Sequence, residues 1–285
     1  MSSALDVQRH GHVNQFCSDY EGLLDYYRAS FDAPVFMEFG TPEFGARNAL
    51  YMAGAACFEA FSPTQPDMAI AAWIKRFGQR WHSLEWTIPS LEEALEIVRE
   101  RGIRVTDHAP DQYFFVHPRD CHGLSLELTT AHFEHDPRES STWDPVAGAG
   151  SNPVGIVGGP TVTLCVKDAQ AAIDWIADLT GREPSALHLG TAPTSAAIDF
   201  GDHIVEFVTP GGDAHDADLA QALAARGDSI YAVTLPVRSL EGAAAVLEER
   251  GARTRLDAQG PIPLLLADEE QTGGALLRFR EHVHA

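Results

Sequence analysis

The sequence contains two copies of one unit, and this repeat restricts the possible folds more than any other feature. The stretch DYEGLLDYY begins at Asp19, and the similar stretch DAQAAIDWI begins at Asp168. SLEEALEIVRERGIRV begins at Ser90, and SLEGAAAVLEERGART begins at Ser239. Both pairs are separated by 149 residues. Because two independent matches share one offset, we expect a tandem duplication of a unit of about this length.

Each unit is itself built from two similar modules. HVNQFCSDYEGLLDYYRASF and HSLEWTIPSLEEALEIVRERG share a plan in which a histidine and a short strand-like run precede an amphipathic helix. In the first helix Tyr20, Leu23, Leu24 and Tyr27 form one apolar stripe. Residues 103–128 then contain three strand-like runs separated by turn residues. The predicted fold class is therefore α+β, with four βαβββ modules arranged as two tandem paired-module units.

A segment rich in Pro, Gly, Ser and Asp separates the two units. It extends from Glu134 to Pro160 and shows no hydrophobic period, which is typical of a linker. We therefore expect an N-terminal unit at 1–135, a linker at 136–157 and a C-terminal unit at 158–285.

The composition argues against several classes of partner. The 285 residues include 41 acidic and 20 basic side chains, so the net charge of −21 would repel a nucleic-acid backbone. We see no apolar run of about 18 residues and no secretory signal, so we expect no membrane partner and a cytoplasmic location. The four cysteines are scattered without a CxxC pair, which indicates reduced, buried residues rather than a disulfide or zinc framework.

Polar residues at equivalent positions of the modules predict a metal site in the N-terminal unit. Its first and last strands carry two histidines and two glutamates: His12, Glu59, His82 and Glu127. The C-terminal unit carries a different set at the corresponding positions: Thr161, Glu206, Tyr231 and Arg278. Imidazole and carboxylate groups together suit a borderline divalent ion, so the predicted cofactor is Zn, Ni, Co, Mn or Fe(II). Only the N-terminal unit has the full ligand set.

The module plan and these ligand positions resemble the vicinal oxygen chelate superfamily, which includes glyoxalase I, bleomycin-resistance proteins and extradiol dioxygenases. Within it, FFVHPRDCHGLSLEL at 114–128 is most similar to the corresponding stretch of methylmalonyl-CoA epimerases. The resemblance implies glyoxalase-like units in which His12, His82 and Glu127 bind the metal. It also implies that Glu43, in the loop TPEFGA, is a catalytic acid/base.

Three functions remain open from the sequence. A metal ion bound to a carbonyl oxygen stabilises the enolate that forms when a neighbouring proton leaves. The candidates for the catalytic acid/base are Glu43, Glu59 and Glu127. We therefore expect a redox-neutral epimerase, isomerase, glyoxalase or lyase. The first alternative is an Fe(II) extradiol-type dioxygenase that uses His12, His82 and Glu127 as a two-histidine-one-carboxylate triad. The second alternative is a non-catalytic ligand-binding or resistance protein.

The expected partner is a small-molecule carbonyl or vicinal-oxygen substrate, and the expected assembly, if there is one, is a homodimer. Arg47 and Arg80 are candidates to pair with a carboxylate of the substrate. The sequence shows neither a phosphate-binding glycine loop nor a basic cluster. The identity of the substrate therefore does not follow from the sequence.

Overall fold

The computed structural model describes residues 4–42, 44–148, 151–185, 194–211, 216–260 and 262–282. The first half of the chain contains β1 (Arg9–Phe16), α1 (Tyr20–Phe31), β2 (Val35–Thr41), β3 (Ala46–Ala53), β4 (Ala56–Pro63), α2 (Ala69–Phe77), β5 (Arg80–Thr87), α3 (Leu91–Glu100), β6 (Val105–Ala109), β7 (Tyr113–Val116) and β8 (Ser125–Thr129). The second half contains β9 (Thr161–Cys165), α4 (Ala169–Thr180), β10 (Thr194–Asp199), β11 (Ile204–Thr209), α5 (Ala217–Arg226), β12 (Ser229–Val237), α6 (Leu240–Glu249), β13 (Thr254–Asp257), β14 (Leu264–Ala267) and β15 (Leu277–Glu281). Short 3-10 helices lie at Pro118–Asp120 and Pro137–Glu139.

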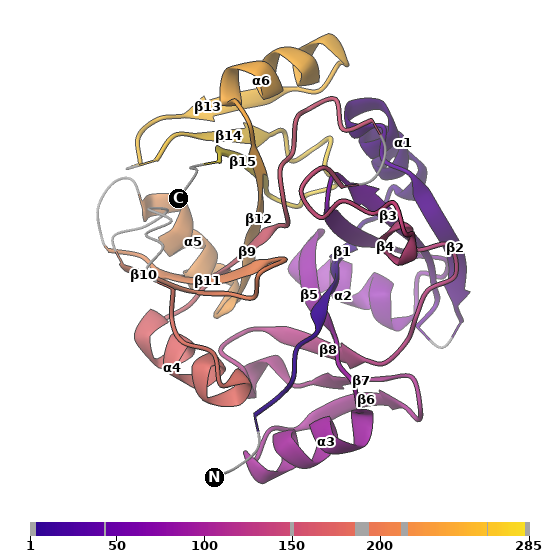
Figure 1. Ribbon diagram of the computed structural model, residues 1–285, viewed down its shortest axis with the longest axis vertical. Helices are drawn as coiled ribbons and strands as arrows, with labels where there is room; N and C mark the ends of the chain where they lie inside the picture. The colour runs from indigo at the N-terminus through magenta and orange to yellow at the C-terminus, as the bar shows by residue number, and fades with distance from the viewer. Residues whose placement is uncertain are drawn as a thin grey trace.

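Each half of the chain forms one mixed β-sheet, and the two halves lie side by side (Figure 1). The first sheet has the strand order β2-β3-β4-β1-β5-β8-β7-β6, and the second has the order β10-β11-β9-β12-β15-β14-β13. At the centre of the first sheet β1 and β5 are antiparallel, and each pairs in parallel with the last strand of its own module, β4 or β8. The α+β class and the tandem arrangement predicted from the sequence are confirmed.

The module plan is seen complete in three of the four modules. In the third module β9, α4, β10 and β11 are present, while 186–193 lie outside the described part of the chain. The helices α2 and α5, which the βαβββ plan does not include, lie between the paired modules. Among the described residues, none of the helices has the length and apolar character needed to cross a bilayer.

Local sequence signals account for where the repeated helices begin. The side chain of Ser90 accepts a hydrogen bond from the backbone N–H of Glu93 at the start of α3. Its repeat counterpart Ser239 caps α6 in the same way, by accepting from the N–H of Gly242. Such caps satisfy N–H groups that have no partner within the helix. The two copies therefore retain the same start signal.

The two halves share one continuous apolar core. Trp81 on β5 is buried and donates a hydrogen bond from Nε1 to the carbonyl oxygen of Leu276, at 2.9 Å. Phe31 and Phe279 stack across the same boundary. Ile156, in the segment expected to be a linker, is buried and forms a β-bridge with Val237. We propose that the boundary between the two units lies in this segment, although part of it packs on the second sheet.

Candidate metal centre

A cavity of about 640 Å³ lies over the central strands of the first sheet. One part of its lining is polar and consists of His12, Asn14, Glu59, Glu85 and Glu127. The remaining walls combine further polar residues, such as Asp107 and Gln112, with aromatic side chains that include Phe16, Phe39, Phe44, Phe61, Trp73 and Phe133. The cavity therefore combines one cluster of ionisable groups with apolar surroundings, which is typical of a small-molecule site.

Three carboxylates surround the imidazole of His12. Its Nε2 lies 2.8 Å from Oε2 of Glu59 and 3.9 Å from Oε2 of Glu127, and its Nδ1 lies 3.2 Å from Oε1 of Glu85. All four residues are at most 8% exposed. The arrangement therefore buries up to three negative charges around one ring, which is costly unless a positive charge compensates them.

The register of the central strands brings these residues together. Glu85 on β5 lies opposite Glu127 on β8. An irregularity of β1 between His10 and Val13 places His12 and Gly11 beside Glu85. A Cβ atom on Gly11 would collide with the carboxylate of Glu85, so this close approach requires glycine.

Buried amides hold two of the carboxylates. Nδ2 of Asn48 donates a hydrogen bond to Oε1 of Glu59 at 2.8 Å, and Nδ2 of Asn14 donates to Oε2 of Glu127 at 3.3 Å. In contrast, both ring nitrogens of His12 and Oε1 of Glu85 have no hydrogen-bond partner among the described residues, because their close contacts lack hydrogen-bond geometry. Buried polar atoms without a hydrogen-bond partner, at the centre of a cluster, are suited to bind an ion.

The pKa values follow from this crowding. Burial opposes protonation of His12, but the carboxylates of Glu85 and Glu59 outweigh it and raise the pKa of the ring well above its usual value. Burial raises the pKa of Glu127 well above its usual value, and the nearby charge of Glu85 raises it further. Without a metal ion, the cluster therefore favours the protonated forms of His12 and Glu127.

The donor atoms fit a divalent cation. Ligand atoms of His12, Glu85 and Glu127 lie within 4.8 Å of one another. One imidazole nitrogen with carboxylate oxygens is a donor set that suits Zn, Mn, Co or Fe(II). Glu59 lies at the edge of this group, close to Nε2 of His12.

The structure brings together three of the four predicted ligands, and it does not bring His82 among them. Asn14 pairs with Ser83 and the next residue, Gln15, pairs with Trp81, so His82 is the extra residue of a β-bulge. A bulge redirects a side chain. The ring of His82 stacks on Phe16 at 4.1 Å, and burial together with the charge of Arg80 lowers its pKa to about 3. In the cluster, Glu85 lies beside His12 and Glu127, where His82 was expected.

Glu85 was missed by the sequence analysis, although a signal was present. Leu84-Glu85-Trp86 places one carboxylate between two large apolar residues, as Leu126-Glu127-Leu128 does. The same argument that singled out Glu127 would have found it. The other predicted acid/base, Glu43, lies outside the described residues, while its neighbours Thr41 and Phe44 line the cavity.

The second half of the chain fills the equivalent place with a protein cation. Thr234 pairs with Arg278 as Glu85 pairs with Glu127, and Thr163 pairs with Glu206 as Asn14 pairs with Glu59. The buried guanidinium of Arg278 donates hydrogen bonds to Oγ1 of Thr234 and Oγ1 of Thr163. The hydroxyl of Thr163 in turn donates to Oε2 of Glu206. A guanidinium therefore lies at the position that corresponds to the metal cluster.

Comparison with known proteins identifies the fold. Neither a protein-family model nor a curated protein matches the sequence. A mutant of 4-hydroxymandelate synthase from Streptomyces coelicolor matches 98% of this chain and 94% of its own, with a TM-score of 0.67 and 12% identity. Methylmalonyl-CoA epimerase from Streptomyces coelicolor, in complex with 2-nitronate-propionyl-CoA, matches 45% of this chain and 100% of its own, with a TM-score of 0.42 and 26% identity. The epimerase from Mycobacterium tuberculosis matches 45% of this chain with a TM-score of 0.40 and 21% identity.

The match to 4-hydroxymandelate synthase extends over nearly the whole chain and defines its class of structure. Both halves are glyoxalase-like units, joined in tandem. The chain therefore has the vicinal oxygen chelate fold, and the resemblance drawn from the sequence is confirmed at the level of the fold.

Proposed function

We propose that the chain is a metal-dependent enzyme of the vicinal oxygen chelate superfamily that transfers a proton at a carbon next to a carbonyl, without net redox change. The observation that carries this proposal is the buried cluster of one imidazole and three carboxylates inside a cavity with several aromatic walls. A metal site with an additional carboxylate beside it is what such a proton transfer requires.

The residues divide into two roles in this proposal. His12, Glu85 and Glu127 would hold the ion, which when bound would supply the positive charge that stabilises an enolate. Glu59 is the remaining carboxylate, and the hydrogen bond from Asn48 fixes its orientation toward the cluster. We assign Glu59 the removal of the substrate proton, with Glu43 as the second candidate acid/base from the sequence resemblance.

The aromatic walls support the same reaction. Phe16, Trp73 and Phe133 keep water away from the cluster and so strengthen the interactions of charges within it. A cavity of about 640 Å³ suits a small organic substrate rather than a polymer.

The dioxygenase alternative requires His12, His82 and Glu127 around one ion. The bulge at His82 directs its ring onto Phe16 and away from this arrangement, so the geometry favours the redox-neutral reaction. The likeness of the whole chain to 4-hydroxymandelate synthase concerns the fold, and oxygen dependence is therefore included as an outcome of the experiment.

The test is metal analysis of the purified protein together with assays in deuterated water. A panel of α-carbonyl compounds is incubated with and without oxygen, and NMR measures deuterium at the carbon next to the carbonyl. We expect exchange that needs metal and does not need oxygen. Glu127→Gln should lose both metal and exchange, whereas Glu59→Gln should keep the metal and lose the exchange. Bound iron with oxygen-dependent turnover, or metal binding without any turnover, would contradict the proposal.

A further inference from the structure

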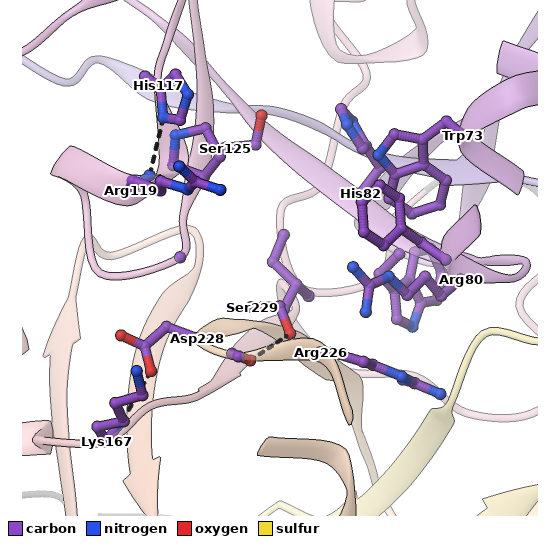
Figure 2. A pocket seen from close by; sticks show the side chains of 16 residues that line it. Trp73, Arg80, His82, His117, Arg119, Ser125, Lys167, Arg226, Asp228 and Ser229 are labelled. Carbon is purple, nitrogen blue, oxygen red and sulfur yellow. Dashed lines mark hydrogen bonds between the residues drawn. The ribbon is translucent and has the colours of Figure 1, made fainter. Parts of the chain in front are cut away.

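A second cavity, of about 580 Å³, lies between the two halves of the chain and gathers basic side chains. The first half contributes Arg80 at the start of β5 and Arg119 from the turn before β8. The second half contributes Lys167 after β9 and Arg226 at the end of α5. Figure 2 shows these residues on opposite sides of the space. We call this cavity the basic cleft.

The positive charge of the basic cleft is largely uncompensated. Its lining contains one carboxylate, Asp228, which accepts a hydrogen bond from the backbone N–H of Lys167. None of the four cationic side chains forms an ion pair with a described residue. The chain as a whole, in contrast, has 41 acidic residues and a net charge of −21. So strong a local excess of cations in an acidic protein indicates a site for an anion.

Arg80 shows this excess most directly. Its Nη1 is buried without a hydrogen-bond partner among the described residues. Burial and the charge of Arg226 lower the pKa of the guanidinium to about 10. The ring of Trp73 packs 5.1 Å from the guanidinium carbon and holds it at the edge of the cleft. A buried donor and mutual repulsion both cost free energy, and an anion in the cleft would relieve both.

The basic cleft borders the cavity of the metal cluster. Five residues line both spaces: Trp73, His82, His117, Pro118 and Ser125. An elongated ligand held at the cluster would therefore have Arg80 and Arg226 beyond His82. His82, at the bulge of β5, is one of the residues that line both spaces.

We propose that the basic cleft binds the phosphate-bearing end of an elongated substrate whose carbonyl end lies at the metal cluster. The guanidinium groups of arginine form paired hydrogen bonds to phosphate oxygens. Four cations also match a ligand group with two or more negative charges better than they match a single carboxylate. The role of the carbonyl end rests on the proposed function, whereas the affinity of the cleft for phosphate does not depend on it.

Binding of pyrophosphate, measured by calorimetry on the full chain, tests the cleft itself. Arg226→Gln and Lys167→Gln change exposed side chains and should fold normally, and each should weaken binding roughly ten- to hundredfold. Arg99→Gln removes an exposed arginine of α3 that lines neither cavity, and it should leave the affinity unchanged. Undetectable binding to the unmodified protein, or equal binding by Arg226→Gln, would overturn the proposal.

Kinetics distinguish a phosphorylated substrate from free phosphate. In the deuterium-exchange assay, a phosphorylated α-carbonyl compound should have a KM at least tenfold below that of its dephosphorylated form. Arg226→Gln should remove this difference with little change in kcat, and pyrophosphate should inhibit competitively. Noncompetitive inhibition would show that the cleft binds free phosphate and would overturn the substrate role. Exchange without any phosphate preference would overturn the substrate role of the cleft and leave the proposed function standing. Pyrophosphate binding without exchange on any compound would reject the proposed function and with it the substrate role.

Discussion

At the scale of single residues, protonation of the cluster is the property with the most direct consequences. The pKa of His12 is raised by Glu85 and Glu59 despite burial, and burial raises the pKa of Glu127. A metal ion needs these donors deprotonated, so metal binding competes with protons for His12 and Glu127.

We therefore predict that the affinity for Mn, Co or Zn falls as the pH falls from 8 to 6. For each proton displaced, the affinity should fall about tenfold per pH unit. Calorimetry in two buffers of different ionisation enthalpy measures the protons released. An affinity that does not change with pH, with no proton release, would show that the cluster is already deprotonated.

His82 adds a second loss at low pH, in the stability of the folded state. Its folded pKa of about 3 lies below the ordinary value of 6.5, because burial and Arg80 disfavour its charged form. Below pH 6.5 the unfolded chain binds the additional proton, so stability is lost as the pH falls toward 3, by at most about 1.4 kcal/mol per pH unit.

The variant His82→Phe should thus lose less stability between pH 7 and pH 5 than the unmodified protein. Urea unfolding at the two pH values measures the difference. The same variant should keep its bound metal, because Glu85 occupies the position in the cluster. Loss of metal in His82→Phe would show that His82 is a metal ligand, as the sequence resemblance implied.

At the scale of elements, two irregularities in the β1–β5 pair decide which side chains meet. The irregularity near His12 turns this ring toward Glu85, and the bulge at His82 turns that ring toward Phe16. Gly11 is essential to the first, since a Cβ there would occupy the space of the Glu85 carboxylate.

We predict that Gly11→Ala displaces Glu85 and lowers metal affinity by at least tenfold, while the fold persists. Metal titration and circular dichroism measure the two properties. Gly242→Ala in α6 is the control, because its Cβ would meet only ordinary contacts at 3.6 Å, and alanine in a helix should stabilise by up to about 1 kcal/mol. Equal metal affinity in Gly11→Ala and the unmodified protein would refute this account of the irregularity near His12.

At the scale of the whole molecule, the two halves have kept the fold and diverged at the centre of each sheet. The first half collects carboxylates around His12, and the second half places Arg278 among Thr163, Thr234 and Glu206. Each centre joins buried acidic and basic groups, and among the described residues the donors grouped closely enough for an external ion are those of the first half.

Arg278→Met should therefore destabilise the chain without affecting metal bound at His12. Removing the cation of a buried charged network typically costs about 3–5 kcal/mol. Chemical unfolding measures the change, and metal analysis checks the first half. Arg255→Gln, which alters an exposed arginine of the same half, should change the stability by less than about 0.5 kcal/mol. A fully stable Arg278→Met would show that this network does not hold the second sheet together.

The sequence by itself determined the repeat, the modules and three members of the cluster. Helix caps such as Ser90 and strand alternation around Glu127 are local signals, and duplication made them visible twice. Tertiary structure alone decided between His82 and Glu85, because a one-residue bulge exchanges the faces of a strand without altering its composition. The tertiary structure also creates the basic cleft, which no local sequence pattern predicts. Arg80, Arg119, Lys167 and Arg226 are far apart in the chain, and only the packing of the two halves brings their charges to one place.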